Sequence, residues 1–266
     1  MKYLFEEDFN TLFKTAKRLF LFLDYDGTLT DFIESPALAF LDKYTRSLLR
    51  RLSKNRRFIL GIISGRGLHD LQRKVGLKGV LYSGSHGLEF YARGKDHRRE
   101  SQITKRYLIA LEDIKKTLGE QLKGIDHVVL EDKEILFAIH YRLASVQNII
   151  RLKKICQRVV SPYVRAKIVR IGTGRRMLEV RPRRQFSKFD AVHFFEKIYK
   201  KKKDDLTIYI GDDVTDEDIF RRMHKRDISV RVEKTQKSKA RYFVHNQFEV
   251  QQFLSALSVL RPFSSS

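Results

Sequence analysis

Two aspartates, Asp24 and Asp26, follow the apolar run LFLFL in the sequence LDYDGTLT. Like charges this close repel each other, and a carboxylate at the end of a buried strand is costly to desolvate. Such a carboxylate can act as a nucleophile toward phosphorus, while a second acid protonates the leaving oxygen and later activates water. We therefore predict that Asp24 is the nucleophile and Asp26 the general acid and base, with Gly27 letting the backbone approach a phosphate.

Further acids near the C-terminus could relieve this repulsion by sharing a cation. Asp212 and Asp213 follow the apolar stretch IYIG, and Asp216 comes three residues later in GDDVTDED. Carboxylate oxygens are the ligands that Mg²⁺ prefers, and the cation would also neutralise phosphate charge. The same acids also suit the N-terminus of a helix, where carboxylates are favoured without any metal.

Two other polar residues could contact a phosphoryl group. Ser64, which follows the stretch LGII, can donate a hydrogen bond, and Lys188 offers a fixed positive charge. Taken alone, Ser64 could belong to a helix-cap turn, and Lys188 is one cation among 54. The combination of these residues, in this order along the chain, favours the catalytic interpretation.

The elements that must position these residues alternate between strand and helix. Helices are expected over residues 41–55 and around residues 68–75, and the first would bury Leu41, Tyr44, Leu48 and Leu52 on one side. Apolar stretches ending in glycine, serine or acids lie before, between and after them. This alternation predicts a parallel sheet covered on both faces, which binds ligands beyond the C-terminal ends of its strands.

A different pattern interrupts this alternation. Residues 103–123 and 145–160 predict helices, and each helix precedes a strand hairpin. The first hairpin is expected to turn around Asp132 and the second at Gly172 and Gly174. We therefore expect a small α+β domain at residues 102–182, inserted into an α/β core formed by residues 1–101 and 183–266.

The strands of this inserted domain alternate between apolar and polar side chains. Ile135, Phe137, Ile139 and Tyr141 share one face, whereas His140 and Arg142 share the other. In the same way, Val128, Leu130, Leu178 and Val180 alternate with Glu131, Lys133, Glu179 and Arg181. One face should therefore pack on the two helices. The polar face is equally consistent with ordinary solvated surface and with a lid over a polar substrate.

The net charge is the main oddity of the composition. The 266 residues include 54 Lys and Arg against 32 Asp and Glu, a net charge of +22, with clusters at residues 50–57, 181–184, 200–203 and 221–226. Such charge could bind nucleic acid, steer a small anionic substrate, or mark solvated helix ends. The clusters are scattered and carry no RNA-recognition signature, zinc-finger spacing or heptads, so nucleic acid is not expected to be the main partner.

Hydrophobic residues make up 42% of the chain, enough for a packed core. The one cysteine, Cys156, excludes an internal disulfide and suits a reducing compartment. It lies on the apolar side of a helical pattern and is expected to be a buried thiol. No segment is long enough to span a membrane, and the N-terminus does not resemble a signal peptide. We expect a cytoplasmic protein.

The motifs DYDGT, ISGR, Lys188 and GDDVTDED, in this order, resemble the four motifs of the haloacid dehalogenase superfamily of phosphohydrolases. The resemblance implies a Rossmann-like parallel-sheet core. The inserted domain resembles the αββαββ cap that closes over the substrate in that superfamily.

Within the superfamily, the stretches GSHGLEF, LEDKEILFAIHYR and MLEVRP resemble those of trehalose-6-phosphate phosphatases. This resemblance implies hydrolysis of trehalose 6-phosphate through an aspartyl-phosphate. Mg²⁺ would be held by Asp24, the Asp26 carbonyl and Asp212, with Asp213 and Asp216 beside them. Ser64 and Lys188 would contact the phosphoryl group. The implied substrate-binding residues are Gly27, Thr28, Gly65, Arg66, His86, Glu131, Lys133, Arg142, Glu179 and Arg181.

One position departs from the superfamily pattern, because Phe189 stands where a glycine commonly follows the lysine. Other substrates remain open: a phosphatase for sucrose phosphate or mannosyl-3-phosphoglycerate would share Asp24 and Asp26. A nucleic-acid- or protein-binding module on the same fold is less favoured, because it would not need the full set of acids. The expected partner is a small sugar phosphate, with functional coupling to a separate trehalose-phosphate synthase, since the chain is too short to include one.

Overall fold

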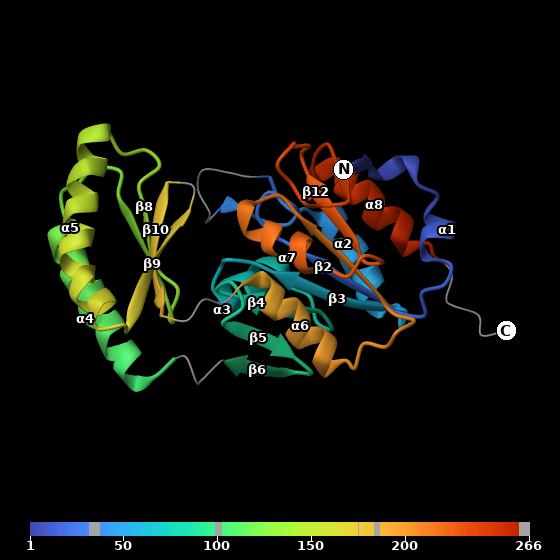
Figure 1. Cartoon of the computed structure of the whole chain (residues 1–266), viewed down its shortest axis with the longest axis horizontal. Coiled ribbons are helices and arrows are strands. Elements are labelled where there is room, and N and C mark those ends of the chain that lie inside the picture. Colours follow the sequence, from blue (N-terminus) through green and yellow to red (C-terminus); the bar gives the residue numbers. More distant parts are fainter. Residues whose placement is uncertain (32–37, 99–102, 175, 184–186, 261–266) are drawn as a thin grey trace. The chain divides into compact units, whose positions relative to one another are not determined.

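The computed structural model describes residues 1–31, 38–98, 103–174, 176–183 and 187–260. The chain divides into two compact units, Met1–His97 with Phe186–Ser266, and Arg98–Gln185 (Figure 1). The expected domain boundary between residues 101 and 102 lies outside the described residues. The expected boundary between residues 182 and 183 falls just inside the second unit.

The described part of the first unit contains a nine-stranded sheet in the order β1-β13-β12-β11-β2-β3-β4-β5-β6. Its strands are β1 (Lys2–Tyr3), β2 (Leu19–Leu23), β3 (Phe58–Ile63), β4 (Leu81–Gly84), β5 (Glu89–Ala92), β6 (Lys95–Arg98), β11 (Leu206–Gly211), β12 (Ile228–Val232) and β13 (Tyr242–Val244). From β1 to β4 every neighbouring pair is parallel, and β5 pairs with β4 in the antiparallel direction. The prediction of an α/β fold with a parallel-sheet core is confirmed.

Helices cover both faces of this sheet (Figure 1). They are α1 (Phe9–Phe13), α2 (Lys43–Lys54), α3 (Leu68–Val75), α6 (Lys188–Ile198), α7 (Glu217–Arg222) and α8 (Gln247–Ser258), with short 3₁₀ helices η1 (Leu4–Glu6) and η3 (Val214–Asp216). Two separate apolar clusters form as a result. One involves α1, α2, α3 and α8, and the other involves α6 and α7.

Strand β2 contributes to both clusters. Leu19, Leu21 and Leu23 pack on the α2 and α8 side, while Phe20 and Phe22 pack on the α6 side. All five side chains are fully buried. Burying a side chain of this size stabilises the fold by roughly 1.5–3 kcal/mol, so the run LFLFL fixes the strand firmly in the middle of the sheet.

The predicted packing of the helix near residue 41 is partly wrong. The helix begins at Lys43, and the Asp42 side chain caps it by accepting hydrogen bonds from the backbone N–H groups of Tyr44 and Thr45. This start places Thr45, Leu48, Leu49 and Leu52 on the buried side. Tyr44 therefore points away from the core and is 55% exposed, because the cap, and not Leu41, sets the phase of the helix.

The second unit has two helices, α4 (Lys105–Gln121) and α5 (Val146–Arg165), and four strands, β7 (Val129–Asp132), β8 (Phe137–His140), β9 (Val169–Gly174) and β10 (Met177–Pro182), within the described residues. The antiparallel sheet has the order β7-β8-β10-β9. Its apolar face packs on both helices through Phe137, Ile139, Tyr141 and Val180, as the alternation predicts. Cys156 lies buried in the same core.

The expected turn at Gly172 and Gly174 is wrong. These glycines lie inside β9, opposite Glu179 and Met177 on β10, so the chain turns further along. A Cβ atom at Gly172 would lie 3.1 Å from Arg181 Nε. The glycine therefore leaves room for an arginine side chain on the neighbouring strand.

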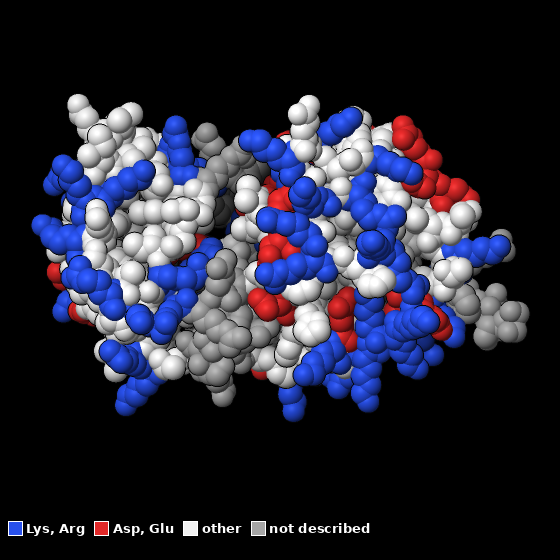
Figure 2. Space-filling model, in the orientation of Figure 1, with Lys and Arg blue, Asp and Glu red and all other residues white. Residues whose placement is uncertain are grey.

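Most of the basic clusters lie at the ends of helices or strands. On the face drawn in Figure 2, the Lys and Arg side chains are spread over both units. Arg57 donates to the carbonyls of Phe13 and Ala16, and Arg226 donates to the carbonyl of Lys203. Lys201 pairs with both Glu196 and Asp227. In the cluster at residues 181–184, Arg184 lies outside the described residues. Among the described residues, no helix combines the length and apolar character needed to cross a membrane.

Candidate active site

Asp24 lies directly after β2, at the C-terminal edge of the parallel sheet. Its backbone N–H donates to the carbonyl of Ile210 on β11 (2.9 Å), which continues the strand pairing up to this residue. One carboxylate oxygen accepts from the N–H of Tyr25 (2.7 Å), and the residue is only 4% exposed. The carboxylate is therefore held at the strand end and shielded from bulk water.

Lys188 reaches this carboxylate from helix α6, of which it is the first residue. Its ammonium nitrogen lies 2.7 Å from Asp24 Oδ2 and 2.9 Å from Asp216 Oδ1. Burial alone would lower the pKa of Lys188, but the carboxylates of Asp216 and Asp24 outweigh it and raise the pKa above its usual value. Lys188 is therefore a permanent positive charge beside Asp24.

Asp216 holds Lys188 in place. It is fully buried, and it also accepts hydrogen bonds from the Tyr209 hydroxyl (2.7 Å) and the Asp213 N–H (2.9 Å). A Cβ atom at Gly211 would lie 2.4 Å from the Asp216 carboxyl carbon, so the glycine makes room for this side chain. With three donors around it, Asp216 is a fixed acceptor within the site.

Asp212 approaches the loop that follows Asp24. Thr28 Oγ1 donates to Asp212 Oδ1 (3.1 Å), and Gly27 has a positive φ of 82°. A Cβ atom at Gly27 would lie 2.2 Å from Asp212 Oδ2, so no other residue fits there without displacing the acid. Burial raises the pKa of Asp212 to about 7, and the Asp216 carboxylate adds to the effect.

Asp24, Asp212 and Asp216 form a cluster whose ligand oxygens all lie within 4.8 Å of one another. Burial raises the pKa of Asp24 well above its usual value, with Lys188 opposing it and Asp216 and Asp212 adding to it. One ammonium does not balance three carboxylates. The excess charge and the all-oxygen donor set fit a hard cation such as Mg²⁺. Asp213 is exposed and lies outside this cluster.

The carboxylate of Asp26 also lies outside the cluster, because Arg66 binds it. Arg66 Nε and Nη2 donate to the two oxygens of Asp26 at 2.7 and 2.6 Å, a bidentate pair. Arg66 is 6% exposed, donates to Asp70 (3.0 Å), and lies over the ring of Tyr25. Its guanidinium group is thus committed to protein acids, although the resemblance implied a contact with substrate.

Ser64 and the residues after it are packed against the turn that follows β4. Ser64 is buried, and its Oγ accepts from the N–H of Arg66 (3.1 Å). The N–H of His86 donates to the Ser64 carbonyl (3.1 Å). A Cβ atom at Gly65 would lie 2.6 Å from the His86 ring, so the glycine lets the imidazole pack on the backbone.

The same turn touches the start of helix α6. Gly87 has a φ of 91°, and a Cβ atom there would lie 2.7 Å from the carbonyl oxygen of Ser187. Ser187 directly precedes Lys188 and donates from its N–H to the Asp190 carboxylate (2.9 Å). Phe189, the departure from the superfamily pattern, packs against the α6–α7 apolar cluster and lies under the guanidinium of Arg222.

The second unit has a charged network of its own on the polar face of its sheet. Glu131 and Glu179 lie in one cross-strand row, with Ala138 between them. Lys133 Nζ lies 2.8 Å from Glu179 and 3.5 Å from Glu131. Glu179 also accepts from Arg181, and Glu131 contacts His140 at 2.7 Å. These charges compensate each other within the unit.

Arg142 lies next to this sheet, after the end of β8. It is half-buried, and its backbone carbonyl accepts a hydrogen bond from Arg176 Nη1 (2.8 Å). The structure therefore brings five predicted residues of the second unit to one sheet and its immediate continuation: Glu131, Lys133, Arg142, Glu179 and Arg181.

Sequence reasoning missed two residues of the first-unit site. Tyr209 donates to Asp216, and Gln247, the first residue of α8, donates from Nε2 to the carbonyl of Gly27 (2.7 Å). Alternation along β11 could have indicated which side of the strand Tyr209 faces. No local signal points to Gln247, because it lies 220 residues from its partner.

Comparison with known structures first defines the class of the fold. A haloacid dehalogenase-like hydrolase from Bacteroides thetaiotaomicron matches 91% of this chain and all of its own with a TM-score of 0.64 at 15% identity. The C-terminal domain of C. albicans trehalose-6-phosphate phosphatase matches 93% of this chain and 95% of its own, with a TM-score of 0.75 at 23% identity. The fold is that of the haloacid dehalogenase-like hydrolases.

Sequence comparison then defines the family. The trehalose-phosphatase family model matches residues 22–248. Probable trehalose-phosphate phosphatase 4 of Oryza sativa subsp. japonica is 31% identical over 259 residues, which cover 94% of this chain and 69% of that protein. The chain belongs to the trehalose-phosphatase family, whose members are phosphoric monoester hydrolases.

Proposed function

We propose that the protein hydrolyses trehalose 6-phosphate to trehalose and phosphate through an aspartyl-phosphate on Asp24, with Mg²⁺ as cofactor. The observation that carries this proposal is the buried Asp24 carboxylate, in contact with Lys188 and within 4.8 Å of Asp212 and Asp216. Family membership supports the choice of substrate.

The carboxylates of Asp24, Asp212 and Asp216 would hold the cation, with the Asp26 carbonyl and Asp213 as further candidate ligands. The cation supplies positive charge that keeps the acids ionised and neutralises the phosphate. Burial raises the pKa of both Asp24 and Asp212, so their ionised forms need positive charge nearby. This need for a counter-charge supports the metal assignment.

In the first chemical step, a carboxylate oxygen of Asp24 attacks phosphorus, and the bond from phosphorus to the sugar oxygen breaks. Asp26, in its protonated form, donates a proton to that oxygen, so trehalose leaves as an alcohol. Lys188 and the side chain of Ser64 stabilise the charge on the phosphoryl oxygens. The ammonium of Lys188 needs no reorganisation, because Asp216 already holds it.

In the second step, Asp26, now ionised, takes a proton from water, which attacks phosphorus. The bond between phosphorus and Asp24 breaks, and phosphate is released. Asp26 ends the cycle protonated, as it began.

We assign Arg66 to the positioning of Asp26. Its bidentate contact fixes the orientation of the Asp26 carboxylate, so that the group faces the same way when it donates a proton and when it accepts one. The additional contact of Arg66 with Asp70 holds the guanidinium group on its other side. A substrate-binding role would instead require Arg66 to release one of these acids.

Recognition of the sugar is assigned to the polar face of the second unit. The network of Glu131, Lys133, Glu179 and Arg181 offers both donors and acceptors with little net charge. Such a surface suits a neutral, hydroxyl-rich disaccharide. Arg142 and, in the first unit, His86, Gly65 and Thr28 are the remaining candidates for substrate contacts.

The test is a panel of sugar phosphates with purified protein and Mg²⁺. Trehalose 6-phosphate should be hydrolysed with a kcat/KM at least about 10²-fold above those of glucose 6-phosphate, sucrose phosphate and mannosyl-3-phosphoglycerate, a preference of the size that a buried polar site can supply. Chelation with EDTA should abolish phosphate release, and Mg²⁺ should restore it. Equal turnover of all the sugar phosphates would overturn the substrate assignment but not the mechanism.

We further propose a cytoplasmic location and a separate synthase as the source of substrate. The buried, unpaired Cys156 supports the first, since it is compatible with a reducing compartment. The second follows from the chemistry, because a phosphatase of this kind needs an enzyme that forms the phosphorylated disaccharide.

A further inference from the structure

The positive charge of the chain is concentrated in the second unit. Residues 98–185 contain 21 Lys and Arg against nine Asp and Glu. About a third of the chain therefore carries more than half of the net charge of +22. The residues proposed above for substrate recognition include only three of these cations, Lys133, Arg142 and Arg181.

Helix α5 differs from its neighbour α4 in how its charges are balanced. Helix α4 carries Lys105, Arg106, Lys115 and Lys116 together with Glu112, Asp113 and Glu120. Helix α5 carries Arg151, Lys153, Lys154, Arg158 and Arg165 and no acidic residue at all in its 20 positions. Like charges one turn apart destabilise a helix, so this composition is not explained by helix stability.

Most of these cations line up along one side of α5. Arg151, Lys154, Arg158, Ser161 and Arg165 follow each other at alternating spacings of three and four residues, which places them on one face of the helix. We call these five residues the α5 stripe. At a rise of 1.5 Å per residue, the stripe is about 21 Å long. None of the basic clusters that are visible in the sequence includes it, because only the helix brings these side chains into line.

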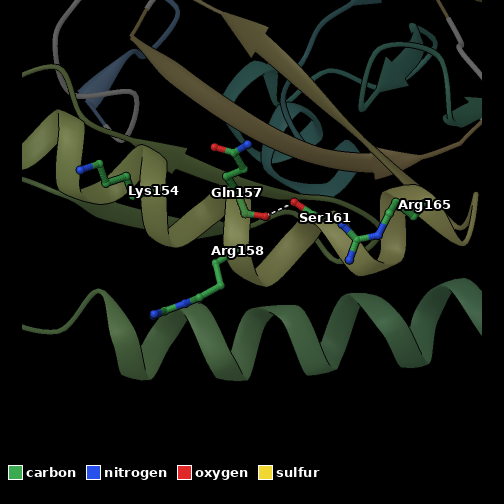
Figure 3. Close-up of a pocket in the computed structure, with 5 residues that line it drawn as sticks. All are labelled: Lys154, Gln157, Arg158, Ser161 and Arg165. Atoms are coloured by element: carbon green, nitrogen blue, oxygen red, sulfur yellow. Dashed lines mark hydrogen bonds between the residues drawn. The ribbon is translucent and has the colours of Figure 1, made fainter.

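The stripe borders a depression in the surface. Figure 3 shows Lys154, Arg158, Ser161 and Arg165 around it, with Gln157 beside them. Arg158 donates to Gln121 of α4 (2.8 Å), which fixes its direction. Within the described part of the chain, no carboxylate forms an ion pair with Arg151, Lys154 or Arg165, and all three are exposed. The stripe thus presents uncompensated cations to solvent, together with the neutral Ser161 and, beside the stripe, the neutral Gln157.

We propose that the α5 stripe binds the phosphate backbone of a nucleic-acid duplex. A duplex carries one negative charge per roughly 1.7 Å of its axis, and it is therefore a dense linear partner for a line of cations. Three of the four cations are arginines, whose planar groups bind phosphate oxygens in pairs. The stripe contains no aromatic residue on which an unpaired base could stack, which favours a duplex over a single strand. Binding of this kind has no sequence preference.

Other polyanions fit less well. An anionic membrane surface would favour aromatic or leucine side chains beside the cations, whereas the exposed apolar residues of α5 are Val146, Ile150 and Val164. An acidic peptide has a lower and less regular charge density than a duplex.

The test is binding of a fluorescent 20-base-pair DNA duplex of mixed sequence, measured by anisotropy with the full-length protein. If all four cations of the stripe contact phosphates, the slope of log K against log salt should be about −3.6, and affinity should fall about 10²-fold between 50 and 200 mM NaCl. Lys154→Gln/Arg158→Gln/Arg165→Gln should reduce the slope to about −0.9 and the affinity at 50 mM by at least tenfold. Glutamine is a good helix former, so α5 should persist in this variant.

A matched control removes the same amount of charge from another exposed helix end, by Arg50→Gln/Arg51→Gln/Lys54→Gln on α2. This control should change the affinity less than about twofold and leave the slope unchanged. Equal losses in the two triple variants would show diffuse attraction to the net charge and overturn the proposal. So would tighter binding of a poly-glutamate peptide or of phosphatidylserine vesicles than of the duplex, or no binding of the duplex at 50 mM NaCl. Hydrolysis of trehalose 6-phosphate should be equal in both variants, which separates this result from the proposed function.

Discussion

Each unit of the molecule contains a buried lysine between two carboxylates, but the surroundings of the two lysines differ. In the first unit Lys188 contacts Asp24 and Asp216, and Asp212 brings a third acid. In the second unit Lys133 contacts Glu179 and Glu131, and Arg181 and His140 add further basic groups. The first site thus has an excess of acid, whereas the second is nearly balanced.

The acid excess of the first unit suits a catalytic site, whereas the balanced network of the second unit suits a surface that positions hydrogen-bonding groups. An acid excess in a buried site is unfavourable unless a cation compensates it. A balanced network needs no added ion and presents fixed donors and acceptors. The two lysines have similar contacts, yet removing one charge from each site, Asp24 in the first unit and Lys133 in the second, should change stability in opposite directions.

The largest effect is expected for Asp24→Asn. Loss of the nucleophile should lower kcat by at least about 10⁴-fold. Burial raises the pKa of Asp24 in the folded state above its unfolded value, so the folded protein loses stability as the pH rises above about 4. Asparagine removes this cost. In EDTA at pH 7, the variant should therefore unfold at the same temperature as the parent or higher, with the difference vanishing near pH 4.

Calorimetry or circular dichroism at both pH values checks this prediction. A melting temperature below that of the parent at pH 7 would contradict the idea of an acid excess. Phosphate release within about 100-fold of the parent would contradict the assignment of the nucleophile.

The next effect concerns Asp26 and Arg66. Asp26→Asn should slow transfer from trehalose 6-phosphate by roughly 10²–10⁴-fold, because the sugar oxygen must be protonated to leave. With p-nitrophenyl phosphate the leaving group needs no proton, so the burst of nitrophenolate in rapid-mixing experiments should fall by less than about tenfold. If Arg66 acts through Asp26, Arg66→Met should also slow the reaction of trehalose 6-phosphate more than that of p-nitrophenyl phosphate, but by a smaller factor than Asp26→Asn.

The competing role for Arg66 gives a different pattern. If Arg66 contacts the phosphate of the substrate, Arg66→Met should raise KM for both substrates together. The ratio of the rates with the two substrates should then stay as in the parent. Arg66→Lys serves as the conservative comparison, since it keeps the charge but loses the bidentate geometry.

In the second unit, Lys133→Met should raise KM for the sugar phosphate by about 10- to 100-fold and leave turnover of p-nitrophenyl phosphate unchanged. It should also lower stability by up to about 3 kcal/mol, because Glu179 is 1% exposed at its side chain and loses a cationic partner. Denaturant unfolding and steady-state kinetics measure the two effects separately.

The double variant Lys133→Met/Glu179→Leu is the control for this pair. Removing both charges should restore part of the stability, since a buried pair replaced by apolar residues is often neutral, while Arg181 loses its contact with Glu179. The raised KM should remain. If stability and KM recovered together, the network would have no separate part in substrate binding.

The smallest effect is expected for Gln247→Ala. Loss of the hydrogen bond to the Gly27 carbonyl, worth about 1 kcal/mol, should lower kcat about fivefold with little change in KM. Phe248→Ala is a matched control, because this neighbour is 64% exposed. Equal effects of the two substitutions would mean that the start of α8, and not the hydrogen bond, is responsible.

The arrangement of the first-unit acids could be predicted because it follows from topology. Parallel strands end at one edge, so acids placed after β2 and β11 had to meet there, and α6 begins close enough to add Lys188. The polar face of the second unit followed from the two-residue period of a strand. Both inferences use only backbone geometry.

The rest depended on side-chain geometry or on residues distant in sequence. Arg66 pairs with Asp26, 40 residues earlier, and nothing in ISGR indicates which acid the arginine will bind. The expected burial of Tyr44 is wrong, because Asp42 caps the helix and Thr45, Leu48, Leu49 and Leu52 form its buried side. The glycines of β9 resemble a turn in sequence, but in the structure Gly172 makes room for Arg181 and Gly174 lies against Met177 on the partner strand.

Gly87 has no functional side chain, yet its small size affects the position of the Lys188 ammonium. Its single hydrogen atom faces the Ser187 carbonyl, and a methyl group in its place would lie 2.7 Å from that oxygen. Any larger residue would therefore push the first turn of α6 outward and withdraw the ammonium of Lys188 from Asp24. How far the Lys188 ammonium reaches into the site therefore depends on Gly87, which lies on a turn more than 60 residues from Asp24 in sequence.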